Sequence, residues 1–275
     1  KKEEKKKKRD LGPSIDSNYV KNMIEKNAFT RKREMKKLEI IKKELGLLKR
    51  LASSTANDNP EKAEILKRIA DAYKDLYDYF NYMAREMDEK IYREKDKKKQ
   101  ATMKAQQKKL EKMSQSAREK SIKAYVEIRN NFSDYPDYDE ILFAIAYEID
   151  QLAAEFEQSE KDKKSAYREK ARVFYQELIR NFPRSRFIPH AWMAFGEFYF
   201  HEAHDVGRAM KAYEKVVEWG EENNPNFVVA MYYQAWCLFN MQEFQQTINQ
   251  FVKVIQYSED HPENREAKSV AKRSR

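Results

Sequence analysis

Glycine and proline are scarce in this chain, with 5 and 7 residues among 275. Their scarcity disfavours the turn-rich sandwiches and the glycine-rich loops of Rossmann sheets. The sequence also lacks Asn-Gly and Asp-Gly hairpin turns and any alternating strand pattern of useful length. With 37% charged residues, the composition is typical of long amphipathic helices. We therefore predict an all-α fold.

Cysteine is limited to Cys237, which leaves no partner for an intramolecular disulfide. Trp236, Leu238 and Phe239 flank it, so we predict a buried thiol packed as an apolar side chain rather than a nucleophile. A single cysteine suits a reducing cytosol and a bacterial periplasm equally well, so it does not decide the compartment.

Long apolar runs are also missing, and none approaches the ~20 residues that span a bilayer. No signal peptide is visible, and the sequence opens on Lys1 rather than Met. We expect a processed or trimmed chain, so the missing signal peptide carries little weight.

Motifs that carry chemistry are absent or weak. Neither G-x-x-x-x-G-K-[ST] nor G-x-G-x-x-G occurs, so nucleotide binding has no support. His201 and His204 have a spacing that fits one helix face, but only neighbouring carboxylates accompany them and no distant third ligand is evident. We therefore expect no metal, no cofactor, no small-molecule substrate and no enzymatic activity.

The strongest pattern in the sequence lies at residues 192–213. It reads W-x2-F-G-x2-Y over residues 192–199 and continues with an A-x3-Y spacing at Ala209 and Tyr213. This pattern, with Leu in place of the first Phe, is typical of the tetratricopeptide (TPR) hairpin, a helix-turn-helix of about 34 residues. A second copy follows, because Tyr213 and Phe251 take the same place in their hairpins 38 residues apart.

A second similarity between two segments of the chain supports the repeat. Residues 128–132 and 179–183 both begin Ile-Arg-Asn, and Phe132 and Phe182 lie 50 residues apart. We predict a right-handed TPR-type solenoid of helical hairpins with an elongated first hairpin. The predicted boundaries are 1–55 for a basic arm and helix, 56–133 for the elongated hairpin, 134–264 for three further hairpins (the last two at 187–222 and 227–258), and 265–275 for the start of another helix.

Charge is divided along the chain. Residues 1–133 hold 37 Lys/Arg and 22 Asp/Glu, whereas residues 134–264 hold 13 and 23. We expect a very basic tip on the elongated hairpin, and its principal lysines are Lys97, Lys98, Lys99, Lys104, Lys108 and Lys109. Binding of nucleic acid or of an anionic membrane through residues 1–133 is the alternative function, but Lys is interleaved with Glu and Asp, which favours a solvated helix surface.

A binding groove is the better-grounded prediction. The first helix of each TPR hairpin lines the concave surface, so its positions outside the core would face a partner. These positions are Phe143, Tyr147, His190, Met193, Glu197, Phe200, His201, Tyr232, Trp236 and Phe239. Such an aromatic groove would accept a peptide or a helix, and carboxylates such as Asp150 and Glu197 would favour a basic one. The alternative is that some of these aromatic residues pack between hairpins.

The repeats also resemble a known group of proteins. Residues 183–200, 230–237, 139–143 and the helix around 77–87 are similar to bacterial cell-envelope TPR proteins associated with gliding motility in myxobacteria and related deltaproteobacteria. The similarity extends over roughly residues 61–262, although the long first hairpin and an insertion at 157–165 depart from the TPR pattern. It implies a non-enzymatic adaptor that binds other proteins in the periplasm or cell envelope, with the cytoplasm and a peripheral membrane contact as alternatives. Because residues 265–275 look like the start of another helix, and an uncapped solenoid would expose apolar surface, we also expect the natural protein to continue beyond Arg275.

Overall fold

The computed structural model describes the backbone of residues 17–274 and the side chains from Lys32 to Ser274, except that of Gln158. Every regular element in this range is helical, so the all-α prediction is confirmed. The elements are α1 (Ser17–Ser54), α2 (Glu61–Arg93), α3 (Lys97–Asn131), α4 (Tyr138–Ala154), η1 (Gln158–Glu160), α5 (Lys161–Asn181), α6 (Ile188–His201), α7 (Val206–Glu218), α8 (Phe227–Asn240), α9 (Phe244–Asp260) and α10 (Arg265–Ser274). The first 16 residues of the predicted basic arm and helix (1–55) lie outside the described range.

Two compact units divide the chain, and each is described by itself. The first consists of α1 with Asp71–Ala117, and the second begins with Thr55–Ala70 and resumes at Arg118. Between residues 17 and 274, no helix is long and apolar enough to cross a membrane.

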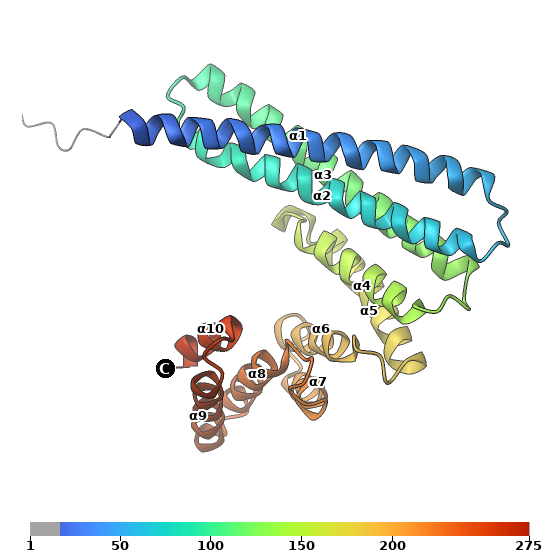
Figure 1. Cartoon of the computed structure of the whole chain (residues 1–275). Helices are drawn as coiled ribbons and strands as arrows, with labels where there is room; N and C mark the ends of the chain where they lie inside the picture. The colour runs from blue at the N-terminus through green and yellow to red at the C-terminus, as the bar shows by residue number, and fades with distance from the viewer. Residues whose placement is uncertain (1–16, 275) are drawn as a thin grey trace, which may run out of the picture. The chain divides into compact units, whose positions relative to one another are not determined.

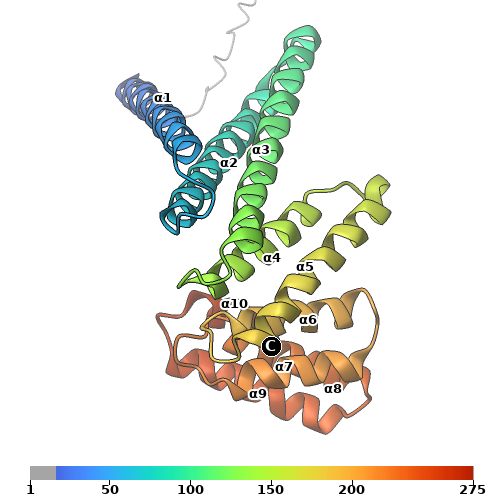
Figure 2. The ribbon, with the colours of Figure 1, turned by 90° about the vertical axis from the view of Figure 1, so that its right-hand side faces the viewer.

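In the first unit, α2 and α3 run side by side, as Figures 1 and 2 both show. The Gln107 amide on α3 reaches across to α2, where it donates to the Ala84 carbonyl at 3.3 Å. Helix α1 buries one stripe of apolar side chains, Ile41, Leu45 and Leu48, spaced by four and three residues.

In the second unit, helices pack in the order of the chain. Helix α4 packs against α5, α6 against α7 and α8 against α9, and the contacts of α5 with α6, α7 with α8 and α9 with α10 join these pairs (Figure 1). Short connections between the helices keep sequence neighbours adjacent in space. Helix α7 begins where the Asp205 carboxylate accepts the backbone N–H of Arg208 at 2.9 Å, a side-chain N-cap.

The loops that join these pairs repeat one pattern of backbone hydrogen bonds. In each, the N–H of a middle residue donates to a carbonyl three residues earlier, and the N–H three residues later donates to the middle residue. The three positions are Phe132, Tyr135 and Tyr138 before α4; Phe182, Ser185 and Ile188 before α6; and Glu221, Asn224 and Phe227 before α8. Ser185 and Asn224 suit the middle position because their side-chain oxygens also accept the backbone N–H two residues later.

The turns inside the hairpins repeat as well. His204, between α6 and α7, and Gln242, between α8 and α9, both adopt left-handed backbone conformations, with φ of 52° and 66°. Their positions are 38 residues apart, the same spacing that separates Tyr213 from Phe251. These two hairpins therefore share their turn geometry as well as their sequence period.

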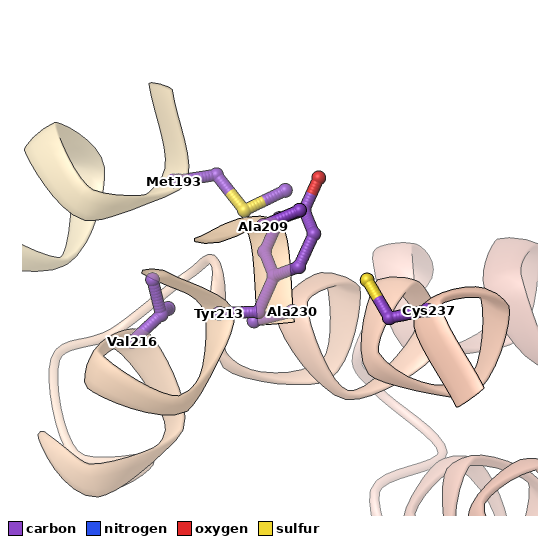
Figure 3. Packing of buried hydrophobic residues seen from close by; sticks show 6 residues of the cluster. All are labelled: Met193, Ala209, Tyr213, Val216, Ala230 and Cys237. Atoms are coloured by element: carbon purple, nitrogen blue, oxygen red, sulfur yellow. The ribbon is translucent and has the colours of Figure 1, made fainter. Parts of the chain in front are cut away.

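The core of the α6–α8 region is built around Tyr213. Figure 3 shows its ring among Met193, Ala209, Val216 and Ala230, with all of these side chains buried. Gly196 on α6 faces the ring so closely that a Cβ atom there would lie 2.4 Å from Tyr213 Cε1. The glycine of the repeat motif is therefore explained by contact with the aromatic residue of the following helix.

Cys237 belongs to the same cluster and is fully buried (Figure 3). Burial, with a smaller contribution from the Glu214 charge, raises the pKa of its thiol to about 12. A thiol with this pKa is almost entirely protonated at neutral pH, so the predicted role as a buried apolar side chain is confirmed.

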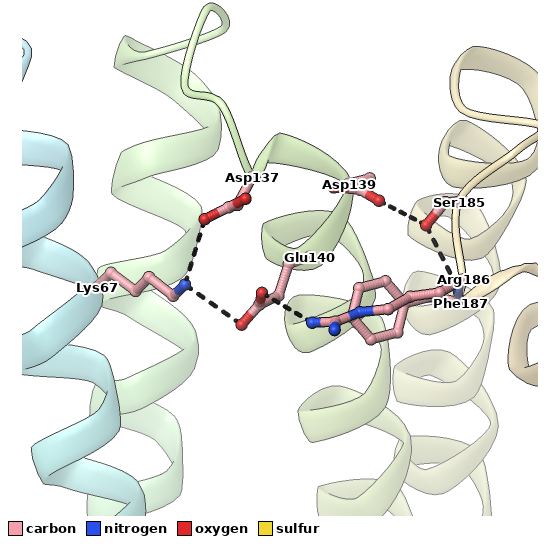
Figure 4. A network of polar contacts seen from close by, with 7 residues as sticks. All are labelled: Lys67, Asp137, Asp139, Glu140, Ser185, Arg186 and Phe187. Carbon is pink, nitrogen blue, oxygen red and sulfur yellow. Dashed lines mark hydrogen bonds and ion pairs between the residues drawn. The ribbon is translucent and has the colours of Figure 1, made fainter. Parts of the chain in front are cut away.

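Polar contacts connect successive loops of the second unit (Figure 4). Lys67 Nζ lies 3.3 Å from Glu140 Oε1 and 3.7 Å from Asp137 Oδ2, which ties the start of α2 to the start of α4. Further along, Ser185 Oγ donates to Asp139 Oδ2 at 2.6 Å. These contacts link α2 to α4, and α4 to the loop before α6.

Candidate functional site

Glu197 and His201, two of the predicted groove residues on α6, line a cavity of about 170 Å³. Helix α4 contributes Asp150, and α5 contributes the wall opposite α6. The lining residues are Asp150, Arg168, Ala171, Arg172, Tyr175, Ala194, Glu197, Phe198, His201 and Glu202. Pockets for drug-sized molecules are usually about 300–1,000 Å³, so this cavity fits the end of one side chain better than a metabolite.

Two arginines of α5 shape the cavity. Arg168 Nε lies 3.8 Å from Asp150 Oδ1, and the same guanidinium pairs with Glu202 through Nη1. The guanidinium of Arg172 stacks 3.6 Å from the centre of the Phe198 ring. Burial lowers the pKa of Arg172 from its ordinary value, although the neighbouring Glu169 and Asp150 charges oppose this. Both cations are thereby held in place by the walls of the cavity.

The negative charges of the cavity carboxylates are less well compensated by their surroundings. Burial raises the pKa of Asp150, against the opposing charges of Arg168 and Arg172. Burial likewise raises the pKa of Glu197 and the negative charge of Asp150 raises it further, while the charge of Arg168 opposes the shift. The Glu197 side chain is open to solvent at the cavity, yet protein surrounds it closely enough to weaken its hydration.

Glu197 therefore presents a carboxylate whose charge is disfavoured in the free protein. Within residues 32–274 it has no ion-pair partner, since Arg168 is bound to Asp150 and Glu202 instead. An ammonium or guanidinium group placed between Asp150 and Glu197 would favour the ionised form of both. The arrangement can thus bind a cation.

His201 does not add a third positive charge to those of Arg168 and Arg172 at neutral pH. Burial lowers the pKa of its imidazole, and the charges of Arg168 and His204 lower it further. Among the described residues, no group of three or more His, Cys, Asp and Glu side chains is placed to hold a metal ion.

A second set of predicted residues forms an aromatic cluster at the start of α4 and α6. The Phe143 ring stacks on Phe187 with centroids 4.4 Å apart, and it lies 5.7 Å from Tyr147 and 5.3 Å from His190. Tyr147 remains 42% exposed. Phe143 is half-buried, because Phe187 from the preceding loop covers one of its faces.

For two residues, the prediction that they face a partner in the groove is wrong. Met193 and Tyr232 are only 6% and 9% exposed. Met193 packs into the Tyr213 core, and Tyr232 is enclosed by Trp236 and Phe251 with ring centroids 6.2 Å and 5.9 Å away. The reason is that each first helix contacts the helices on both sides, which buries a wider stripe than one hairpin alone requires.

The remaining groove residues are intermediate or exposed. Phe200 is half-buried, with its ring 5.9 Å from that of Tyr233. Trp236 is half-buried beside Phe239, and Phe239 is 47% exposed at the end of α8. Phe239 belongs to a different surface, on α8 and α9, and it is not among the residues that line the cavity.

Arg168 and Arg172 are functional candidates that the sequence prediction missed. Both lie on α5, the second helix of its hairpin, whereas the prediction considered only first helices. Their spacing of four residues beside the buried Ala171 and Tyr175 was the available signal, because it places both arginines on one flank of the buried stripe.

The lysines of the predicted basic tip lie at the start of α3. Asp96 accepts the backbone N–H groups of Lys98 and Lys99 at 2.8 Å and 3.3 Å, which caps this helix. All six predicted lysines, Lys97, Lys98, Lys99, Lys104, Lys108 and Lys109, are exposed.

Comparison with known proteins adds no relative: no family model, no curated protein and no solved structure matches the chain. The functional argument therefore depends on the geometry given above.

Proposed function

We propose that the chain is a non-enzymatic protein-interaction scaffold that binds a basic segment of a partner protein at the cavity between α4, α5 and α6. The observation that carries this proposal is the unpaired Glu197 carboxylate beside Asp150, with the pKa of each raised by burial. A lysine or arginine side chain of the partner would enter the cavity and pair with both groups.

The scaffold part of the proposal is a right-handed, TPR-type solenoid. It is supported by the 38-residue spacing of the His204 and Gln242 turns, by the repeated loop hydrogen bonds, and by the contact of Gly196 with Tyr213. Successive hairpins that pack only on their neighbours build an extended surface of this kind.

The aromatic residues around the cavity give the partner apolar contact. Tyr147 is 42% exposed one helical turn from Asp150, and Phe200 lies one turn from Glu197. Aromatic side chains provide large contact area at small entropic cost, so they would hold the apolar neighbours of the inserted cation.

The test is binding of fluorescent Lys/Arg-containing peptides, read by anisotropy against matched peptides in which Gln replaces each cation. Glu197→Gln and Asp150→Asn should each weaken the cationic peptides by about 10-fold or more and leave the Gln peptides unchanged. Glu214→Gln, an exposed carboxylate on α7, is the matched control. Equal binding of the Lys/Arg and Gln peptides by the unmodified protein would refute the proposal.

We further propose that this scaffold works in a bacterial cell envelope, as the resemblance of its repeats implies. Fractionation of cells that express the full natural gene, followed by detection in periplasmic, membrane and cytosolic fractions, tests this placement. Recovery in the cytosol alone would contradict it.

A second candidate function is binding of an anionic membrane or nucleic acid at the start of α3. It is favoured by the six exposed lysines and by Tyr92, which is 88% exposed at the end of α2. Co-sedimentation with anionic vesicles and binding to duplex DNA at low and high salt distinguish it, because electrostatic binding must fall steeply with salt.

A further inference from the structure

Helix α9 carries a stripe of apolar side chains that the rest of the described chain leaves about half exposed. Phe244, Ile248 and Val252 follow one another at intervals of one helical turn and are 56%, 58% and 54% exposed. Phe239 and Met241, 47% and 40% exposed, extend this stripe across the turn from α8. The rings of Phe239 and Phe244 lie 5.8 Å apart, so the surface is continuous. We call these five residues the α9 stripe.

The sequence around the α9 stripe is almost free of charge. Residues 227–256 contain only two charged side chains, Glu243 and Lys253, in a chain that is 37% charged. The stripe is flanked by amides instead, and Gln245 donates to Asn249 at 3.3 Å. A strongly charged partner would therefore find little counter-charge here, and an anionic membrane would find little attraction.

An uncharged surface of this kind is complementary to itself. Two copies of a charged patch repel each other, whereas two apolar stripes attract, and amides such as Gln245 and Asn249 both donate and accept hydrogen bonds. A twofold-symmetric contact requires the same surface on both copies. These properties identify a second copy of this chain as the partner that the surface fits best.

The size of this surface determines how strong an association between two copies can be. Five side chains that are about half exposed present on the order of 500 Å² of apolar surface. Two copies would bury about 1,000 Å² together, which is the lower limit for a specific interface and typical of weak, reversible association. The contact should therefore depend on protein concentration.

We propose that the α9 stripe is a self-association surface through which two copies of the chain form a symmetric dimer. The proposed twofold axis passes at Ile248, the middle of the three residues on α9, so that Ile248 meets Ile248 of the second copy. This surface is separate from the cavity between α4, α5 and α6, and the proposal does not depend on peptide binding there.

The test is sedimentation velocity of the full chain from about 1 µM to about 200 µM. The unmodified protein should shift from monomer to dimer over this range, and Ile248→Glu should remain monomeric throughout. Val173→Glu on α5 is the matched control, because Val173 is 57% exposed and lies outside the stripe. Circular dichroism spectra and Tm values should be unchanged in both variants, since neither side chain is part of the core.

A second experiment tests the symmetry. Ile248→Glu and Ile248→Lys should each be monomeric alone but should associate when mixed, because the two new charges then face each other. A monomer at every concentration, a dimer that survives Ile248→Glu, or a mixture of the two variants that stays monomeric would each overturn the proposal.

Discussion

Replacement of Gly196 by alanine tests the packing that defines the repeat. The added methyl group would lie 2.4, 2.7 and 2.8 Å from three ring carbons of Tyr213. Ordinary contacts between such atoms are about 3.5–4.0 Å, so the ring would have to move by more than an ångström. It has little room to do so, because Tyr213 is fully buried and stacks on Tyr233 with ring centroids 5.3 Å apart.

The magnitude follows from two opposing effects. Overpacking a core costs about 1–3 kcal/mol, and Gly→Ala inside a helix returns at most about 1 kcal/mol. The overlap is severe, so we expect a net loss of about 1–2 kcal/mol in the free energy of unfolding. For a domain of roughly 150–250 residues this lowers Tm by about 2–8 °C in thermal unfolding followed by circular dichroism.

Gly46→Ala is the control, because no atom lies within 4 Å of a Cβ there and Gly46 is exposed on α1. It should raise stability by up to about 1 kcal/mol. The cost of Gly196→Ala should also shrink in a Tyr213→Leu background, since the smaller side chain leaves room for the methyl group. A Tm that rises in Gly196→Ala, or a cost that is unchanged beside Tyr213→Leu, would refute the packing argument.

Three further predictions concern polar groups, two of them buried and the third, Glu197, at the cavity. Tyr213→Phe should leave Tm unchanged or raise it, because the Tyr213 hydroxyl is buried without a hydrogen-bond partner; a loss above about 1 kcal/mol would contradict this. Arg118→Met should cost about 3–5 kcal/mol in a urea titration, because Arg118 Nε lies 3.2 Å from Glu148, whose side chain is only 4% exposed. Arg118→Met combined with Glu148→Leu should recover most of that loss, and failure to recover would contradict the charge argument. Glu197→Gln should raise Tm at neutral pH but not at acid pH. Because the pKa of the Glu197 carboxyl is raised in the folded state, the folded protein keeps this proton to a higher pH than the unfolded chain does. The free energy of unfolding therefore falls as pH rises through the folded-state pKa, and the glutamine variant avoids this loss.

The sequence predicted the helical class because its signals are local. Scarce glycine and proline and the periodic apolar positions act within single helices, and such patterns survive in the folded chain. The contact between Gly196 and Tyr213 is also local, since both residues lie at fixed positions of one hairpin. The burial of Cys237 followed from its apolar neighbours in the sequence.

The cavity could be predicted only in part. Asp150, Glu197 and His201 were identified from their positions on first helices, but Arg168 and Arg172 reach the cavity from α5, a helix that the repeat pattern assigns to the other side of the hairpin. Which side chains meet across three helices depends on the crossing angles of those helices, and a single sequence does not specify these angles.

The burial of Met193 and Tyr232 also depends on how neighbouring helices pack, which a single sequence does not specify. A residue outside the core of its own hairpin can still be buried by the next one, as both are. The α9 stripe is the converse case: Phe244, Ile248 and Val252 are large apolar side chains, yet the structure leaves each more than half exposed. Their exposure depends on which helices pack beside α9, and only the structure shows that.

The most direct test of the cation-binding cavity is the pKa of Glu197 itself, followed by NMR of the side-chain carboxyl carbon as pH is varied. In the free protein this pKa should lie above the ordinary value of 4.5, because burial and the charge of Asp150 disfavour the ionised form. A bound Lys- or Arg-containing peptide should lower the pKa, since a cation beside the carboxylate favours its ionised form. A pKa that is the same with and without the bound peptide would contradict the account.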